Sequence, residues 1–361
     1  MLFDVKRFLS HAIQENITDI HFRAGLPPIV RRNGAIEKVL DEPALSENDI
    51  KMITEAMIPE KLKYRIKEVY DFDFPYSIDG VARFRVNMLY ESNRIALSIR
   101  YIPYHIPTLE KLKLPALIRK FVTFNNGLVL VTGATGSGKS TTLASLLEYI
   151  NQNQQKHIIT IEDPIEFVFQ SKKSFFTQRQ IDLDTDSFPD GVKYALRQNP
   201  DIILVGEMRD KETVASAIKA AETGHLVFST LHTNDSIQTI NRIINLFEPH
   251  QRNYITTQLA NIMRGVISQK LIPKADGNGR VAAVEVLTVT PAVKNYMIKD
   301  QIDDIYEQLN TGSQNDMLSL NSSLCKLARA NVITDIAAVQ ASEYQNELRQ
   351  MLRGAYTGSQ R

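Results

Sequence analysis

Gly133-Ala134-Thr135-Gly136-Ser137-Gly138-Lys139-Ser140-Thr141 is the stretch of this chain that decides its fold. It fits the phosphate-binding pattern of Gly, any four residues, and Gly-Lys-Ser/Thr without a mismatch. The apolar run 128–132 before it is typical of a buried strand, and residues 141–150 after it carry Leu and Ile at helical spacing. Strand, glycine loop and helix is the context that the motif requires, so the stretch predicts a nucleotide-binding loop.

The residue types of this loop suit the phosphates of a nucleotide. Glycines let the backbone curl so that its N–H groups converge on phosphate oxygens, and the start of the following helix adds partial positive charge. Lys139 is expected to reach the β- and γ-phosphates, and Ser140 is expected to hold Mg²⁺.

Length and composition set broad limits. At 361 residues the chain favours two domains of unequal size, and its 43% hydrophobic and 23% charged residues are ordinary for a soluble globular protein. Its net charge of 42 − 41 = +1 gives no global attraction to nucleic acid or to a membrane. Cys325 is the only cysteine, which excludes an internal disulfide and a four-thiolate zinc site.

Neither a signal peptide nor a membrane span is expected. The N-terminal segment 1–14 is amphipathic and lacks an apolar core, and no apolar stretch approaches the length that crosses a bilayer. We therefore expect a cytoplasmic protein that reaches a membrane only through a partner.

The first part of the chain contains a predicted hairpin with arginines on one face. Apolar and polar residues alternate along 83–102 around a turn at 91–93, which predicts two antiparallel strands. The less apolar face carries Arg83, Arg85 and Arg100. A solvated face explains such arginines in most proteins; the alternative is a cation that stabilises transferred charge in a nucleotide-hydrolysing site.

A proline-containing segment divides the sequence. Residues 103–117 are expected to be a linker between an α+β domain at 1–102 and a second domain at 118–361. Strands and helices alternate in the second domain, which predicts a parallel sheet covered by helices.

Acidic residues follow two predicted strands of the second domain. Glu162, Asp163 and Glu166 come after the strand at 157–161, and Glu207 follows the strand at 201–205. Catalytic groups of open α/β sheets lie at the carboxyl ends of strands. An acid in this place can hold Mg²⁺ through water or orient the attacking water.

Two histidines bracket a third predicted strand. His225 precedes the strand at 226–230 and His232 follows it. Single histidines are usually structural hydrogen-bonding residues, whereas a pair around a core strand of an ATPase can sense the γ-phosphate. Both interpretations stay open from the sequence.

The order of these motifs resembles the PilT-type retraction ATPases of the type IV pilus, within the type II/IV secretion ATPase superfamily. The segments that carry the resemblance are GATGSGKSTT (Walker A), ITIEDPIEF (aspartate box), DIILVGEMRD (Walker B), TGHLVFSTLHTND (histidine box) and, nearer the N-terminus, DIHFRAGLPPIVRRNG, RFRVN and SIRYIP. The resemblance covers nearly the whole chain.

The short retraction branch fits best. Extension and type II secretion relatives usually carry an extra N-terminal domain and a four-cysteine zinc insertion, and this chain has neither. A PilU-like accessory motor remains the alternative. Two departures stand out: the retraction helix that usually reads close to AIRNLIRE matches the divergent residues 292–300, and Ser229 replaces an expected glycine.

The resemblance implies a mixed α/β chain: a PAS-like N-terminal α+β domain and a RecA-like P-loop ATPase domain with C-terminal helices. It implies ATP and Mg²⁺ as ligands and a homohexameric ring. The expected partners are a PilC-like inner-membrane platform protein and a second retraction ATPase, and the expected location is cytoplasmic, peripheral to the inner membrane.

The resemblance also implies residue roles. Glu166 is favoured for polarising water, with Glu162 as the competing carboxylate, and Glu207 supports a Mg²⁺ held by Ser140. Each of the three hairpin arginines is a candidate for the cation that stabilises the transition state, and the sequence does not rank them. His225 and His232 are expected to link the γ-phosphate to domain movement. Nucleotide contacts are expected from Gly133, Ala134, Thr135, Gly136, Ser137, Gly138, Lys139, Ser140 and Thr141.

Two other functions compete. A nucleic-acid translocase could use the same core, but the neutral net charge and the lack of a basic, aromatic-rich strand-binding segment argue against it. A non-hydrolysing regulator of pilus assembly is opposed by the intact loop, carboxylates and arginines.

Overall fold

The computed structural model describes residues 3–15, 17–32, 35–102, 105–311 and 316–354. The chain forms two compact units. The first comprises Met1–His105 with Asp163–Val168 and Gln180–Asp184, and the second comprises Ile106–Glu162, Phe169–Arg179 and Thr185–Arg361. The expected linker at 103–117 begins at residues 103–104, outside the described residues, and the domain boundaries stay a prediction.

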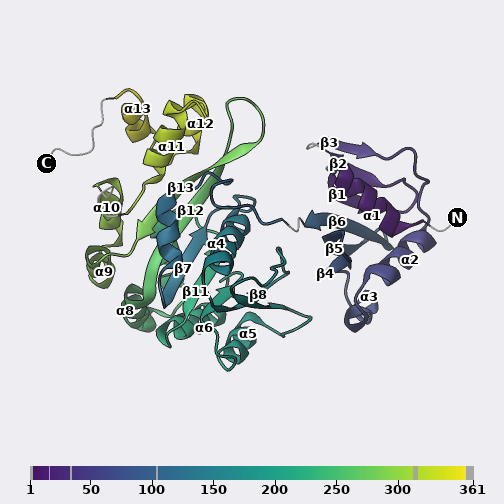
Figure 1. Cartoon of the computed structure of the whole chain (residues 1–361), viewed down its shortest axis with the longest axis horizontal. Coiled ribbons are helices and arrows are strands. Elements are labelled where there is room, and N and C mark those ends of the chain that lie inside the picture. Colours follow the sequence, from purple (N-terminus) through teal and green to yellow (C-terminus); the bar gives the residue numbers. More distant parts are fainter. Residues whose placement is uncertain (1–2, 16, 33–34, 103–104, 312–315, 355–361) are drawn as a thin grey trace. The chain divides into compact units, whose positions relative to one another are not determined.

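The first unit is built on an antiparallel sheet, six-stranded among the described residues, in the order β3-β2-β1-β6-β5-β4 (Figure 1). Its strands are β1 (Ile17–Phe22), β2 (Ile29–Arg32), β3 (Ala35–Lys38), β4 (Asp71–Ile78), β5 (Ala82–Glu91) and β6 (Arg94–Ile102). Its helices are α1 (Val5–Gln14), α2 (Glu47–Met57), the short turn η1 (Glu60–Leu62) and α3 (Arg65–Glu68).

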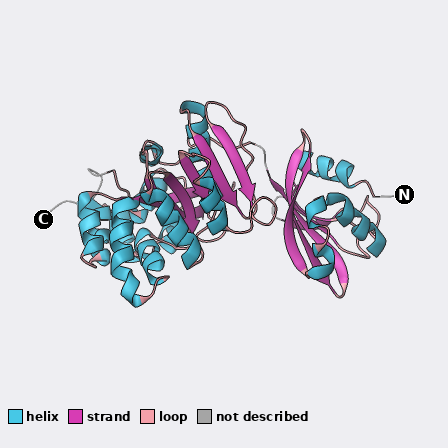
Figure 2. Ribbon diagram, turned by 90° about the horizontal axis from the view of Figure 1, so that it is seen from below, coloured by secondary structure: helices cyan, strands magenta, loops and turns pink. Residues whose placement is uncertain are grey.

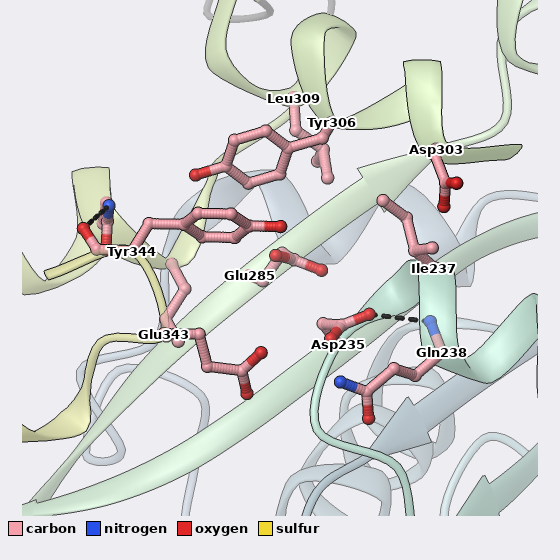
Figure 3. A pocket seen from close by; sticks show the side chains of 11 residues that line it. Asp235, Ile237, Gln238, Glu285, Asp303, Tyr306, Leu309, Glu343 and Tyr344 are labelled. Carbon is pink, nitrogen blue, oxygen red and sulfur yellow. Dashed lines mark hydrogen bonds between the residues drawn. The ribbon is translucent and has the colours of Figure 1, made fainter. Parts of the chain in front are cut away.

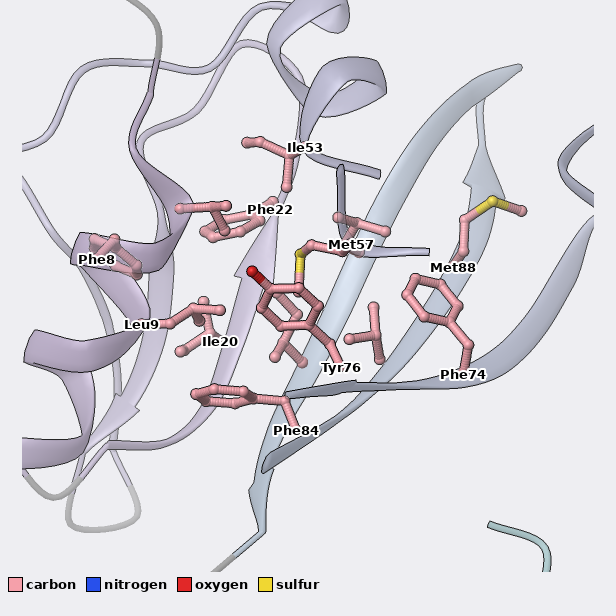
Figure 4. Packing of buried hydrophobic residues seen from close by; sticks show 14 of the residues in the cluster. Phe8, Leu9, Ile20, Phe22, Ile53, Met57, Phe74, Tyr76, Phe84 and Met88 are labelled. Carbon is pink, nitrogen blue, oxygen red and sulfur yellow. The ribbon is translucent and has the colours of Figure 1, made fainter. Parts of the chain in front are cut away.

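The helices of the first unit cover one face of this sheet (Figure 2). Helix α2 begins at a capping box, in which the Ser46 hydroxyl accepts from the Asp49 backbone N–H and the Asp49 carboxylate accepts from the Ser46 N–H. The buried face of the sheet and the helices share one apolar core (Figure 4), whose labelled members are Phe8, Leu9, Ile20, Phe22, Ile53, Met57, Phe74, Tyr76, Phe84 and Met88. The opposite, polar face therefore carries the arginines of β5 and β6.

The second unit contains a sheet of seven strands among the described residues, in the order β13-β12-β7-β11-β10-β8-β9 (Figure 1). Its strands are β7 (Gly127–Thr132), β8 (His157–Glu162), β9 (Phe175–Gln180), β10 (Ile202–Val205), β11 (Leu226–Leu231), β12 (Met263–Pro273) and β13 (Arg280–Thr288). Its helices are η2 (Ala116–Val122), α4 (Lys139–Asn153), α5 (Phe188–Ala195), α6 (Lys211–Glu222), α7 (Ser236–Asn245), η3 (Pro249–Gln251), α8 (Arg252–Ile262), α9 (Pro291–Ile298), η4 (Ile302–Asp304), α10 (Ile305–Thr311), α11 (Leu320–Arg329), α12 (Asp335–Ala341) and α13 (Gln345–Leu352).

The central strands of this sheet are parallel, which follows from their composition. β8, β10, β11, β7 and β12 run in the same direction, and every residue of β7, β10 and β11 is buried. Strands covered by helices on both faces need such unbroken apolar runs. Helices α4 and α6 both contact β7 and β11, so the loop that joins β7 to α4 lies at the middle of one sheet edge.

The sequence pattern of residues 236–269 predicts helix throughout, and the structure shows that this prediction is wrong for the last part. Helix α8 ends at Ile262, and the chain passes directly into β12, which pairs with β7 through Val266 and Ile267. Both of these side chains are completely buried. The apolar residues of this segment fit a helical pattern as well as a strand pattern. The segment forms a strand because it pairs with β7.

The C-terminal helices pack on the last two strands. Helix α11 contacts β13 and helix α12 contacts β12, and both also contact α13. Their apolar faces form a separate cluster that includes Leu324, Ala338 and Leu348. No helix within the described ranges is long and apolar enough to cross a membrane.

Candidate functional site

The glycine loop has the backbone conformation that its glycines predict. Gly133, Gly136 and Gly138 have φ angles of 143°, 77° and 89°, in the region that L-residues with a side chain rarely adopt. A Cβ on Gly133 would lie 2.3 Å from the Gln269 carbonyl oxygen and 2.5 Å from the Ser137 hydroxyl. The loop is therefore tightly seated against β12, and α4 starts directly after it.

The loop presents a buried cation and a buried hydroxyl. Lys139 is only 8% exposed, and its Nζ donates to the carbonyl oxygens of Gly133 at 2.8 Å and Ala134 at 3.0 Å. The Ser137 Oγ is buried with no hydrogen-bond partner in the described part of the chain. A folded loop that curls around a lysine and holds an unsatisfied hydroxyl fits an anionic ligand such as a phosphate group.

Sequence reasoning missed Gln269, which fixes the loop from β12. Its Nε2 donates to the Ser137 carbonyl at 2.6 Å, and its Oε1 accepts from the Thr142 hydroxyl at 2.7 Å. Gln269 and Thr142 are both buried. The sequence offers one signal for this role, a glutamine within an apolar run whose pattern also fits a helix.

Two of the predicted carboxylates meet at the same edge of the sheet as the loop. β8 and β10 are neighbours with Ile161 opposite Val205, so Glu162 and Glu207 follow adjacent strand ends. Strand β11 lies between β10 and β7, which puts the β10 end two strand spacings, roughly 10 Å, from the end of β7. Glu162 is buried and accepts from the Thr160 hydroxyl at 2.7 Å.

His232 bridges this gap. Its Nε2 lies 3.0 Å from the Glu207 Oε1, and its Nδ1 lies 3.5 Å from the Thr135 hydroxyl in the glycine loop. Arg209 also contacts the Glu207 carboxylate. The imidazole thus joins the carboxylate after β10 to the loop after β7, from its place at the end of the strand between them.

The second histidine lies elsewhere. His225 precedes β11, and its carbonyl accepts from the backbone N–H of Gly127, the first residue of β7. Its ring contacts the Ala220 carbonyl at 3.1 Å and the Thr223 hydroxyl at 3.2 Å. Because β11 and β7 are parallel, His225 lies a whole strand length, roughly 17 Å, from the loop edge. The structure does not bring the two histidines together.

The remaining predicted site residues belong to the first unit. Glu166 lies in the exposed part of the segment Asp163–Val168. Arg83 and Arg85 lie on the polar face of β5, and Arg85 is directly opposite Arg100 of β6. Only Glu162 of the two competing carboxylates is in the same unit as the glycine loop.

Arg85 and Arg100 have acidic partners on this polar face, whereas Arg83 contacts the amide oxygen of Gln180. Arg85 Nη2 donates to Asp73 at 2.6 Å, and Arg100 Nε donates to Asp19 at 2.8 Å. Burial raises the pKa of Asp19, but hydrogen bonds from Arg100 and Thr18 outweigh it and hold that pKa below its usual value. The side chain of Arg100 is 69% exposed, so this pair leaves its guanidinium accessible.

A cavity of about 230 Å³ adjoins the start of α4. Gly138 and Thr141 form one wall, and the segment 111–114 and the hairpin of β12 and β13 form the others. Its lining includes four cations that sequence reasoning did not select, namely Lys111, Lys113, Lys274 and Arg280. These side chains give the wall of the cavity beside the loop a positive charge.

The sequence is similar to a known family and to curated proteins. Residues 3–353 match the family described as "Type II/IV secretion system protein". The chain is 40% identical over 331 residues to the "Type IV pilus retractation ATPase PilT" of Pseudomonas aeruginosa, covering 92% of this chain and 96% of that one. It is 35% identical over 350 residues to the "Type IV pilus ATPase PilU" of the same organism, covering 97% and 91%.

A solved structure is also similar. The structure titled "Crystal Structure of the Pilus Retraction Motor PilT and Bound ADP" matches with a TM-score of 0.90 and 42% sequence identity. The match covers 97% of this chain and all of that one.

Proposed function

This chain belongs to the type II/IV secretion system protein family, and we propose that it is an ATP-hydrolysing motor that drives retraction of a type IV pilus. The observation that carries the proposal is the contact of His232 with both Glu207 and Thr135. It brings a carboxylate beside a phosphate-binding loop, and hydrolysis of a nucleoside triphosphate needs both groups. The type IV pilus enters the proposal from the names of the similar proteins, which mention pilus retraction.

The loop and its lysine bind and orient the triphosphate. Backbone N–H groups of 133–138 surround the phosphates, and Lys139 exchanges its carbonyl acceptors for phosphate oxygens. Ser140 and Glu207 would hold Mg²⁺, which neutralises charge on the phosphates when bound. The cations of the cavity beside Gly138 add positive charge next to the loop, which favours the phosphates of the nucleotide.

A carboxylate must orient the attacking water. The position of Glu162 at the end of β8, next to the strand that leads to Glu207, supports it for this role. Glu166, which the sequence favours for the same role, remains the competing residue. His232 connects the carboxylate side of the site to the loop, so it is suited to convert the presence of the γ-phosphate into movement of the β11 end.

We propose a ring of six copies, in line with the resemblance of the motifs. In such a ring, Arg83, Arg85 or Arg100 of one copy supplies the cation that stabilises charge at the nucleotide of another. The accessible guanidinium of Arg100 supports this possibility. The further proposed partners are an inner-membrane platform protein and a second retraction ATPase, and the proposed location is the cytoplasmic side of the inner membrane.

Purified enzyme tests the chemistry. Lys139→Ala is expected to abolish ATP binding, whereas Glu207→Ala is expected to bind ATP and hydrolyse it very slowly. Glu222→Gln, which removes a charge from the exposed side of α6, serves as the matched control and keeps normal turnover. Near-normal turnover of Glu207→Ala would remove Glu207 from the mechanism.

Cells carrying Lys139→Ala test the biological role. An increase in surface pili together with lost surface motility supports retraction. Few or no pili would assign the motor to extension instead. Unchanged pili with unchanged motility would favour the alternative that this chain is an accessory motor similar to the PilU relative. Stimulation of the ATPase by DNA would support the translocase.

A further inference from the structure

The second unit contains another cavity, away from the glycine loop. Its volume is about 280 Å³. It lies between the start of α7, the middle of β13, the helices α10 and α11, and the segment 343–344 between α12 and α13. The cavity is therefore large enough for a small molecule or the end of a long side chain.

All the charged side chains that line it among the described residues are acidic. Asp235, Glu285, Asp303 and Glu343 all border the cavity, and no lysine or arginine does so among the described residues. Lys270 contacts one of these acids, and its Nζ lies 3.2 Å from Glu343 Oε1. One ammonium on one carboxylate leaves the cavity with an excess of negative charge.

Glu285 is the most deeply placed of these acids. It is only 5% exposed, and both of its hydrogen bonds go to the same oxygen, Oε1, from the backbone N–H and the hydroxyl of Ser236 at 2.8 and 2.6 Å. Its second oxygen has no hydrogen-bond partner among the described residues. Burial raises the pKa of Glu285 to about 7, and burial also raises that of Asp235. A half-satisfied carboxylate on a cavity wall is costly without a donor from a ligand.

An aromatic wall faces the same space. The rings of Tyr306 and Tyr344 lie 4.3 Å apart between centroids at 31°, and Tyr306 is anchored by its hydroxyl, which donates to Glu347 at 2.7 Å. Figure 3 shows Tyr306 on one side of the Tyr344 ring and the carboxylates of Asp235, Glu285 and Glu343 on the other. The face of Tyr344 and the acids thus border the same opening.

We propose that this cavity binds a guanidinium group, offered either by a free small molecule or by an arginine side chain of another protein. A guanidinium is planar and stacks on an aromatic ring, and its edge donates in parallel to carboxylate oxygens. Glu285 accepts through its open oxygen, and Asp235 and Glu343 lie on the same side of the ring. A hard divalent cation would use the oxygens but gain nothing from the tyrosines.

Binding to the purified full chain tests the proposal. Agmatine serves as the free guanidinium, and a blocked Gly-Arg-Gly peptide serves as the arginine side chain, each titrated by isothermal calorimetry. Glu285→Gln keeps the acceptor for Ser236 and removes the charge, so we expect it to weaken binding by about tenfold or more. Tyr344→Leu is expected to weaken binding about threefold, whereas Tyr344→Phe keeps the ring and the affinity.

Two controls separate a folding defect from a lost site. Asp235→Asn preserves the cap of α7, since asparagine also caps helices, and it is expected to lower affinity in a fully folded protein. Glu222→Gln changes net charge by the same amount outside the cavity and should leave the affinity unchanged.

The outcomes distinguish the two sources. Binding of agmatine assigns the site to a free small cation, and binding of the peptide alone assigns it to a partner's arginine. The proposal is overturned if neither probe binds, or if both bind Glu285→Gln as well as they bind the natural chain. The residues of this cavity contribute nothing to the glycine loop, so failure here leaves the ATPase proposal intact.

Discussion

Replacing Gln269 with leucine tests whether β12 holds the glycine loop in its binding shape. The substitution removes the hydrogen bonds to the Ser137 carbonyl at 2.6 Å and from the Thr142 hydroxyl at 2.7 Å. Leucine fills a similar volume, so the loss is chiefly polar. Each buried group left without a partner costs about 1–3 kcal/mol, and two such groups give an expected loss of about 3 kcal/mol in unfolding free energy.

The same substitution should weaken ATP binding. If about 1.4 kcal/mol of the loss is spent in disordering the loop, the dissociation constant for ATP rises about tenfold. Denaturant unfolding and ATP titration measure the two effects. The control is Ser268→Ala, which removes the adjacent buried bond from Thr132 to Ser268 at 2.9 Å without touching the loop.

A double-mutant cycle sharpens this test. Thr142→Val alone leaves the Gln269 amide oxygen without its donor, but in the Gln269→Leu background it removes an orphaned hydroxyl. The two changes should therefore combine to cost about 1 kcal/mol less than their sum. Strict additivity, or equal loss of ATP affinity in Ser268→Ala, would refute the view that Gln269 specifically orders the loop.

Three further predictions follow from the same geometry. His232→Ala should lower kcat about tenfold, whereas His225→Ala at the opposite sheet edge should stay within about twofold; equal losses would contradict the separation of the two histidines. Gly133→Ala places a Cβ 2.3 Å from a carbonyl oxygen and should lower the unfolding free energy by about 1–3 kcal/mol, measured by denaturation. Glu285 has its pKa raised from 4.5 to about 7, so its contribution to stability is present below pH 4.5 and lost as the pH rises to about 7. Glu285→Gln should therefore gain about 3 kcal/mol relative to the natural chain over that interval, and parallel pH profiles would contradict the raised pKa.

The sequence was sufficient where one local pattern has one structural solution. The loop between β7 and α4 and the hairpin of β5 and β6 both appear where the pattern predicts them. In each case the deciding contacts lie within a few residues along the chain. The mixed α/β fold follows from the alternation of such segments and is confirmed.

Long-range pairing explains what the sequence could not supply. The 263–273 segment has apolar residues compatible with a helix, and only the place beside β7 makes it a strand. Gln269 acquires its role from that pairing, since its partners lie more than a hundred residues earlier in the chain. A polar residue in an apolar run predicts a buried hydrogen bond but does not identify the partner.

The two histidines show the same limit at a single strand. In the sequence, His225 and His232 flank β11 symmetrically, and nothing local distinguishes one end from the other. The parallel pairing of β11 with β7 breaks this symmetry, because it sets Leu231 beside Thr132, the residue that precedes the glycine loop. His232 then comes within reach of both Thr135 and Glu207, while the ring of His225 contacts the Ala220 carbonyl and the Thr223 hydroxyl at the end of α6. A strand flanked by identical residue types therefore needs the direction of its neighbour before either residue can be given a catalytic role.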